Sequence, residues 1–203
     1  MTEVEFKIFK ESKDFHLSVN KVVYSLLFLS FSVAYSGGKF LGNILVRDIG
    51  VAGCFLVSIL IFIFKIIQQF RKKALNGTLD DTLRLTETEI FIGRENYLLA
   101  EISKIEFEAG DYYNRWEYQS KGNLNPARTN GTDNTCKITL KSGERIVVNF
   151  QLLFEHEFIK MKELLIHYHS ENKIHFLKLI EYLEIDRYEE IQAFKKTLQS
   201  QLN

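Results

Sequence analysis

The sequence contains few residues that cross-link or interrupt a chain, with one proline and two cysteines among 203 residues. Cys54 lies in an apolar run, whereas Cys136 adjoins a predicted strand, so the two differ too much in setting to pair. We expect both thiols to be reduced, which fits a soluble domain in the cytosol. A fold that depends on disulfides is therefore not expected.

Sequence motifs that carry chemistry are also missing. Neither a Gly-rich phosphate loop nor a nucleophile elbow occurs in the chain. Asp80 and Asp81 form an acidic pair, but nothing in the sequence desolvates them, and we interpret them as solvated charge. The sequence predicts a protein that is not an enzyme and that has no cofactor.

The formal net charge is zero, but the two parts of the chain differ in sign. Residues 1–73 carry ten Lys and Arg against five Asp and Glu, whereas residues 74–203 carry sixteen against twenty-one. Binding of nucleic acid requires basic residues that displace counterions from phosphate. The acidic remainder of the chain therefore argues against a nucleic-acid partner.

Two apolar runs lie in the basic part. The first covers residues 22–35 and, extended through Gly37, Gly38 and Phe40 to Val46, approaches the roughly 20 residues that span hydrocarbon. The second, residues 49–67, holds no charge before Lys65, whose ammonium can reach the headgroups. The sequence predicts a transmembrane hairpin with spans at about 22–46 and 49–67, although the second run also suits a buried core helix.

The basic residues predict the orientation of this hairpin, because positive flanks stay in the cytoplasm. The connector carries Lys39 and Arg47, with Asp48 beside them. The flanks carry more basic residues: Lys7, Lys10, Lys13 and Lys21 before the first span, and the membrane-anchoring Lys65, Arg71, Lys72 and Lys73 at the second. We expect both termini to be cytoplasmic, with the lipid bilayer as one partner.

A cleavable secretory signal is an alternative for the first run, with Ala34-Tyr35-Ser36 as the cleavage site. The region before this run is long and carries four acidic residues, Glu3, Glu5, Glu11 and Asp14. A signal peptide has a short basic region there, so we favour a retained span.

Gly38 and Gly42 have the small-xxx-small spacing of closely packed helices. We favour the alternative that Gly37-Gly38-Lys39 marks a bend or the end of the first helix. The N-terminal stretch from Val4 to Phe9 alternates in polarity, and both a short strand and an interfacial amphipathic segment fit it.

The chain after residue 73 has the alternation of strands. A hairpin is predicted over 82–93 with Glu87 and Thr88 at its turn, followed by strand patterns over 97–99, 102–108, 135–140 and 145–150. Residues 110–134, which hold the only proline, are interpreted as an extended hairpin loop or a mobile excursion. The period then predicts an amphipathic helix over residues 154–168, followed by one or two more helices.

These elements resemble the bacterial membrane-anchored pleckstrin-homology-like (PH-like) proteins of the YcxB-like kind. Residues 83–92, 99–106 and 138–150, leading into 154–168, carry the resemblance. It implies an α+β membrane protein of the bacterial inner membrane, in which an antiparallel-sheet PH-like domain is capped by a helix over 152–169. The loop at 110–134 and the chain after about residue 171 depart from the pattern.

The resulting domain organisation has four parts. A cytoplasmic N-terminal segment covers residues 1–20, the transmembrane hairpin 21–73, the PH-like domain 74–170 and a C-terminal helical extension 171–203. Many pleckstrin-homology domains hold phosphoinositides with a basic first hairpin, whereas the turn at 86–89 here carries Glu87 and Glu89. We do not expect lipid-headgroup recognition at that turn.

His156, Glu163, His167 and His169 are the best metal candidates, because three of them share a helix face. Neither a cysteine nor metalloprotease spacing accompanies them, so we interpret them as surface residues and predict no metal site.

The segment around the only tryptophan combines aromatic residues with an arginine, as protein interfaces do. Its members are Tyr112, Tyr113, Arg115, Trp116 and Tyr118. The alternative is a strand whose aromatic side chains pack on the sheet. We take these residues as the candidate interface.

The function that these patterns favour is a membrane-tethered, non-enzymatic interaction or scaffold module whose partner is another protein; a homo-oligomer stays open. One alternative is an immunity or defence factor that neutralises a toxin at the membrane, by analogy alone. The other is a metal-dependent enzyme that uses the histidines.

Overall fold

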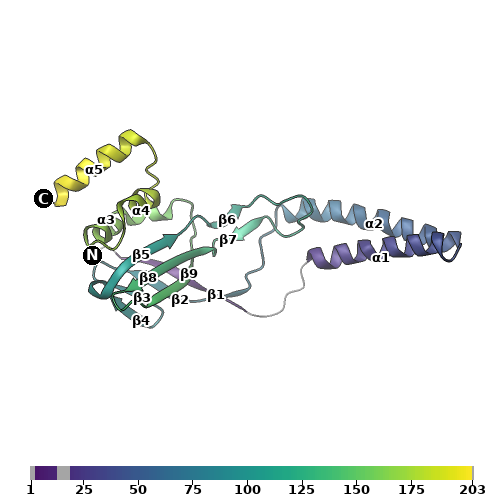
Figure 1. The fold of residues 1–203 in the computed structure, drawn as a ribbon, viewed down its shortest axis with the longest axis horizontal. Helices are drawn as coiled ribbons and strands as arrows, with labels where there is room; N and C mark the ends of the chain where they lie inside the picture. The colour runs from purple at the N-terminus through teal and green to yellow at the C-terminus, as the bar shows by residue number, and fades with distance from the viewer. Residues whose placement is uncertain (1–2, 13–18, 203) are drawn as a thin grey trace. The chain divides into compact units, whose positions relative to one another are not determined.

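A computed structural model describes residues 3–12 and 19–202 of the chain, drawn as a ribbon in Figure 1. Two compact units divide it. The sheet unit comprises residues 1–12, 75–113 and 130–203, and the hairpin unit comprises residues 13–74 and 114–129. The chain therefore leaves the sheet unit twice and returns twice. Lys13 and Asp14, used above in the orientation and signal-peptide arguments, lie outside the described residues.

The sheet unit is built on seven strands in the order β4-β3-β2-β1-β9-β8-β5, with antiparallel neighbours throughout. The strands are β1 (Val4–Glu11), β2 (Gly77–Leu85), β3 (Glu89–Ile92), β4 (Glu95–Leu98), β5 (Ile102–Glu108), β8 (Asn134–Leu140) and β9 (Arg145–Gln151). Two short strands, β6 (Tyr113–Trp116) and β7 (Arg128–Asn130), form a separate two-stranded sheet. The predicted hairpin at 82–93 and the later strand patterns are confirmed.

Strand β1 lies inside the seven-stranded sheet, between β2 and β9. Its register runs from Val4 opposite Leu85 to Glu11 opposite Gly77. The Ser12 amide then donates to the Asn76 carbonyl at 2.9 Å, so the chain leaves and re-enters the sheet at adjacent positions. Of the two predictions for the N-terminal stretch, the strand is the one observed. The helical hairpin is thus an insertion between two paired strands and does not precede the domain.

Side chains alternate between the two faces of each strand, so aromatic residues from several strands point into one common core. Phe6, Phe107 and Phe150, on β1, β5 and β9, are each at most 3 % exposed. The rings of Phe6 and Phe150 lie 5.1 Å apart, and that of Phe158 lies 5.2 Å from Phe107. Strands that are distant in the sequence are therefore held together by one cluster of rings.

The helix expected over 152–169 begins later than predicted. A 3-10 turn, η2 (Glu157–Met161), leads into α3 (Lys162–Ser170), which lies beside α4 (Phe176–Tyr182) in Figure 1. The Tyr168 hydroxyl donates to the Thr86 carbonyl at 2.7 Å and so links α3 to the β2–β3 turn. Helices α4 and α5 (Tyr188–Leu202) bury Leu179 and Leu198 in the same core, so residues 171–203 belong to the sheet unit.

The hairpin unit contains two apolar helices that run side by side, α1 (Val19–Lys39) and α2 (Ile44–Gln68) (Figure 1). Both are long and apolar enough to cross a membrane. Only 6 % and 11 % of their most apolar stretches is buried within the protein. The core helix of a soluble domain would be mostly buried, so the exposed surface of α1 and α2 separates them from that class.

The junction between the helices lies earlier than the predicted boundary between residues 46 and 49. Helix α1 ends at Lys39, where Gly37-Gly38-Lys39 suggested an end. The Asn43 side-chain oxygen accepts hydrogen bonds from the Leu45 and Val46 amides at 3.0 and 3.3 Å and so caps the start of α2. Gly42, at a φ of +57°, makes the turn.

Small residues let α1 and α2 approach closely, but they are not Gly38 and Gly42, whose spacing suggested the alternative that we did not favour. A Cβ atom on Gly50 would lie 2.2 Å from the Ala34 nitrogen, and one on Gly37 would lie 2.5 Å from the Arg47 nitrogen. A Cβ atom on Gly42 would meet nothing within 4 Å. The spacing of Gly38 and Gly42 therefore does not mark the contact, because Gly42 lies in the turn and not on a helix face.

Candidate functional site

Residues 114–129, here called the capping segment, fold onto the end of the hairpin at which α1 begins and α2 ends. The Ala127 amide donates to the Gln68 carbonyl at 2.9 Å, and the Arg128 amide donates to the Arg71 carbonyl at 3.2 Å. The Lys73 amide donates in turn to the Arg128 carbonyl at 2.8 Å. These bonds join the backbone at and just after the end of α2 to the end of the capping segment.

Leu124 fixes the capping segment between the two helices. Its side chain is fully buried against Val23 of α1 and Val57 of α2. Partly buried apolar residues surround this contact: Val19, Leu27 and Ile61. A single apolar residue of a polar loop thus contributes to the only buried apolar cluster that the described part of the hairpin unit contains.

Polar contacts hold the backbone around Leu124. The Asn20 side-chain oxygen accepts from the Leu124 amide at 2.8 Å, and its amide group donates to the Asn123 side chain at 3.1 Å. The Tyr24 hydroxyl donates to the Gly122 carbonyl at 2.6 Å. Gly122 has a φ of +90°, a conformation that side-chain-bearing residues rarely adopt. The N-terminal part of α1 therefore binds the backbone of the loop around Leu124.

Inside the sheet unit, Asn134 joins the chain just before the capping segment to the chain just after it. Asn134 is 1 % exposed. Its side-chain oxygen accepts from the Gly110 and Asp111 amides, both at 3.0 Å. Its amide group donates to the Asp111 and Gly131 carbonyls, both at 2.8 Å. The chain before the capping segment and the chain after it are therefore fixed by one buried side chain.

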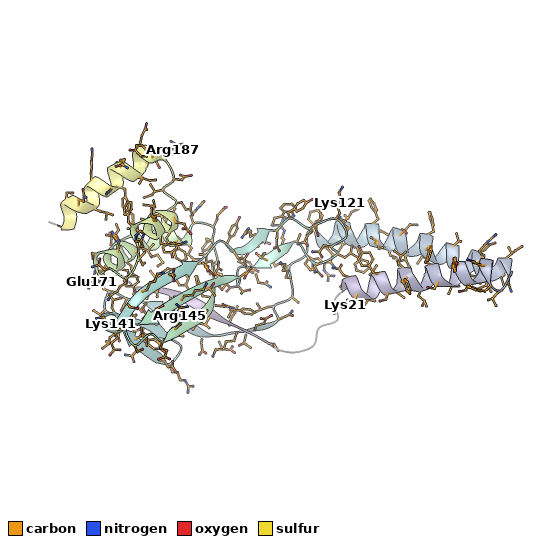
Figure 2. All side chains as sticks on the ribbon, viewed as in Figure 1. Lys21, Lys121, Lys141, Arg145, Glu171 and Arg187 are labelled. Atoms are coloured by element: carbon orange, nitrogen blue, oxygen red, sulfur yellow. The ribbon has the colours of Figure 1, made fainter. Side chains whose placement is uncertain are left out.

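The predicted anchoring residues have different roles in the hairpin unit. Lys73 forms an ion pair with Glu117 of the capping segment, and Lys72 forms a parallel bridge with Arg128. Arg71 accepts through its carbonyl, as described above, and Lys65 lines a pocket beside the capping segment. Figure 2 labels Lys21 and Lys121 at the same end of the hairpin, so basic side chains gather there from three parts of the chain.

The predicted interface residues are divided between the two units. Tyr112 packs partly buried against the core of the sheet unit, and the Tyr113 amide donates to the Leu152 carbonyl at 2.9 Å. Arg115, Trp116 and Tyr118 belong to the capping segment. Trp116 and Tyr118 are 51 % and 74 % exposed, and their rings meet edge to face at 6.3 Å. The five residues therefore do not form one patch within a single unit.

Leu124, Asn20 and Gln68 are the site residues that sequence reasoning missed. Leu124 is the one large apolar residue between Tyr118 and Pro126, and such isolation in a polar run was a usable signal. The sequence gives no comparable signal for Asn20 and Gln68, because a polar residue beside an apolar run is ordinary at the end of a span.

The histidines that were metal candidates lie in separate contacts. His156 pairs with Glu184 through Nδ1 at 2.9 Å, His167 contacts the Glu87 carbonyl at 2.9 Å, and His169 contacts the Ile174 carbonyl at 2.8 Å. Across residues 3–12 and 19–202, no group of three His, Cys, Asp or Glu side chains could hold a metal ion.

Other titratable groups of the sheet unit also have structural partners. A hydrogen bond and ion pair with Lys10 lower the pKa of Asp81, one of the two predicted solvated carboxylates. Burial raises the pKa of the Cys136 thiol, which opposes formation of a reactive thiolate. The hydrogen bond with Glu184 raises the pKa of His156.

Comparison with known proteins returned no matching family model, no matching curated protein and no matching solved structure. The features described above define the class of the protein: an α+β chain with two apolar N-terminal helices and a mostly antiparallel sheet.

Proposed function

We propose that the protein is a membrane-tethered interaction module, in which α1 and α2 cross a bilayer as a hairpin and hold a PH-like sheet unit at the cytoplasmic face. The observation that carries this proposal is the apolar surface that the two helices leave uncovered. Phe28, Leu45, Phe55 and Phe62 are between 68 % and 74 % exposed. Soluble proteins rarely leave a continuous apolar surface of this kind in water.

The distribution of basic residues supports the orientation. Lys21, Lys65 and Lys121 lie at the capped end of the hairpin, near the sequence Arg71-Lys72-Lys73. The opposite end carries Lys39 and Arg47, and Arg47 is paired with Asp48 at 2.9 Å. Basic flanks remain in the cytoplasm, so the capped end and both termini are assigned to that side.

The sheet unit supports the PH-like assignment in its order of elements. Its last strand, β9, leads through η2 into α3, and Leu164 and Leu165 of α3 are fully buried in the core. An antiparallel sheet with a helix closing its core is what the resemblance implies. The non-enzymatic part of the proposal is supported by the histidines and by Asp81, each of which is engaged in a structural contact.

Cysteine labelling tests the hairpin. Phe40→Cys places a thiol in the connector, where Phe40 is 73 % exposed, and Ser142→Cys places one in the β8–β9 turn. In intact bacterial cells, a membrane-impermeant maleimide should label position 40 at once and position 142 only after lysis. Equal labelling of both positions before lysis, or recovery of the chain in the soluble fraction, would contradict the proposal.

Photo-crosslinking tests the interaction role. Tyr118 and Tyr188 are 74 % and 75 % exposed and lie in the capping segment and on α5, so they are matched positions for a photoreactive amino acid. A discrete protein adduct at Tyr118 that is absent at Tyr188 would support a partner at the capping segment. Adducts with protein at neither position would contradict an interaction module that uses these surfaces.

A further inference from the structure

A pocket of about 200 Å³ lies within the hairpin unit, between the last turn of α2 and the capping segment. Helix α2 and its cap contribute Lys65, Gln68 and Gln69. The capping segment contributes Trp116, Tyr118 and Lys121, together with polar loop residues. The pocket therefore combines cations, amides and aromatic rings where the apolar surface of α2 ends.

Gln68 is the unusual member of this set, because it is 5 % exposed and its side-chain oxygen accepts no hydrogen bond from the described residues. A buried carbonyl oxygen without a donor is unfavourable, and native proteins rarely retain one. The backbone carbonyl of the same residue is already satisfied by the Ala127 amide. Because Gln68 lines the pocket, rotation of its side-chain amide would present this oxygen to a ligand that carries a hydrogen-bond donor.

The charges around the pocket favour a ligand that also carries an anionic group. Lys65 and Lys121 line it, and neither forms an ion pair with a described residue. The lining contains no Asp or Glu, and the nearby Glu117 is paired with Lys73. Two ammonium groups without a carboxylate form a site for a phosphate.

The aromatic residues place the pocket at the depth of lipid headgroups if the hairpin spans a bilayer. Trp116 and Tyr118 are large amphipathic side chains, of the kind enriched where membrane meets water. On α2, between the lining residues Lys65 and Gln68, Ile66 and Ile67 are 49 % and 46 % exposed. A ligand in the pocket can therefore place its acyl chains on an apolar surface and its polar end among the lysines.

We propose that this pocket binds the headgroup of a phospholipid in which a phosphate is joined to a hydrogen-bond-donating amine, as in phosphatidylethanolamine. The phosphate lies at Lys65 and Lys121, and the ammonium donates to the Gln68 side-chain oxygen. Gln68 is the last residue of α2, and the carbonyl end of a helix dipole favours cations. The inference rests on the membrane insertion proposed above.

The chemistry of the headgroup supplies the test, because phosphatidylcholine has the same phosphate but a quaternary ammonium without an N–H group. Trp116 is the only tryptophan of the chain and lines the pocket, so its fluorescence reports binding directly. The full-length protein in a phosphate-free detergent is titrated with dihexanoyl phosphatidylethanolamine, dihexanoyl phosphatidylcholine and free phosphoethanolamine. We expect saturation by the ethanolamine lipid at a concentration roughly tenfold below that of the choline lipid, for one charge-assisted hydrogen bond.

Variants separate the two halves of the headgroup. Gln68→Leu removes the acceptor at similar volume and should abolish the preference for ethanolamine over choline, whereas Gln68→Glu keeps an acceptor and should retain it. Lys121→Ser should weaken binding of both lipids by a similar factor. Lys141→Ser, which removes a lysine of the sheet unit from the β8–β9 turn, is the matched control and should change neither (Figure 2).

Three results would contradict the proposed headgroup site. Equal affinity for the two lipids in the wild type, or a preference that survives Gln68→Leu, removes the role of Gln68. Saturation by free phosphoethanolamine at the concentration of the lipid assigns the pocket to a soluble phosphate ester. The cysteine labelling of the hairpin uses a different readout, so failure of membrane insertion and failure of headgroup binding are distinguishable.

Discussion

The two units use the same apolar residue type in opposite ways. Phe107 and Phe150 of the sheet unit are 1 % and 0 % exposed, whereas Phe55 and Phe62 of the hairpin unit are 70 % and 68 % exposed. Removal of apolar surface from water stabilises the sheet unit by about 25 cal/mol for each Å² buried. The helices of the hairpin unit leave most of this stabilisation unrealised in water, because most of their apolar surface is not covered by the described chain.

The two units also differ in the size of the residues that hold their elements together. The sheet unit joins its strands through large rings, such as Phe6 against Phe150 at 5.1 Å. The hairpin unit joins its helices through small residues, since Gly50 allows the Ala34 backbone to approach. Small residues at a helix interface are typical of packing in lipid, where the hydrophobic effect does not drive helices together. The comparison therefore predicts which substitutions each unit tolerates.

The largest expected effect is the loss of a ring from the sheet core. Phe107→Ala removes contacts with Phe158 at 5.2 Å and Tyr182 at 5.6 Å and should destabilise the sheet unit by about 3–5 kcal/mol. Phe55→Ala removes the same ring from α2 and should leave the urea midpoint of the sheet unit unchanged. Pulse labelling of the buried thiol of Cys136 in urea measures both variants in full-length protein. Similar urea midpoints for Phe107→Ala and wild type would contradict the claim that buried rings stabilise the sheet unit.

A charge in the apolar surface of α2 is the next largest effect. Phe55→Arg places a guanidinium near the centre of the helix, where insertion into a bilayer costs about 2.5–3.5 kcal/mol. The fraction of the chain that resists alkaline carbonate extraction should fall severalfold. Phe154→Arg, at a position that is 58 % exposed in the sheet unit, is the control and should leave that fraction unchanged. An unaltered membrane fraction for Phe55→Arg would contradict the assignment of α2 as a span.

The elements that sequence reasoning predicted well are those defined by local periodicity. The hairpin of β2 and β3 and the hairpin of β8 and β9 each join neighbouring segments with alternating polarity, so the pattern contains both partners. The apolar helices follow from composition alone. Their junction was misplaced because the apolar run continues through Ile44, Leu45 and Val46, and the capping role of Asn43 was not weighed.

Partners that are distant in the sequence could not be predicted. Strand β1 pairs with β2 across an insertion of two helices, and Asn20 binds the Leu124 amide across 104 residues. A single sequence carries no signal for either pairing, because no residue type requires it. The capping segment therefore read as a free loop with an aromatic interface, whereas the structure packs its centre between α1 and α2.

Leu124 tests whether this packing stabilises the hairpin unit. Leu124→Ala removes a fully buried side chain at the rim of the unit, and we expect a cost of about 2 kcal/mol, at the low end for such a change. Hydrogen exchange of residues 114–129 and of the first turn of α1 should rise, with the sheet unit unaffected. Asn125→Ala changes the neighbouring residue, whose side chain forms no hydrogen bond with the described residues, and it should leave the exchange of α1 unchanged.

The smallest expected effect concerns the ion pair between Asp81 and Lys10, which joins β2 to β1 in the sheet unit. Lys10 lowers the pKa of Asp81 from its ordinary value of 3.8. A carboxyl group with a lower pKa in the folded state stabilises that state fully above pH 3.8 and loses the contribution as the pH falls through the folded-state pKa. Asp81→Asn should therefore lower the urea midpoint slightly at neutral pH, and its difference from wild type should close on acidification below pH 3.8. Asp80→Asn removes a charge from the adjacent residue, which forms no ion pair with the described residues, and is the control for net charge. A difference that persists at the acid end would assign the effect of Asp81 to packing and not to its charge.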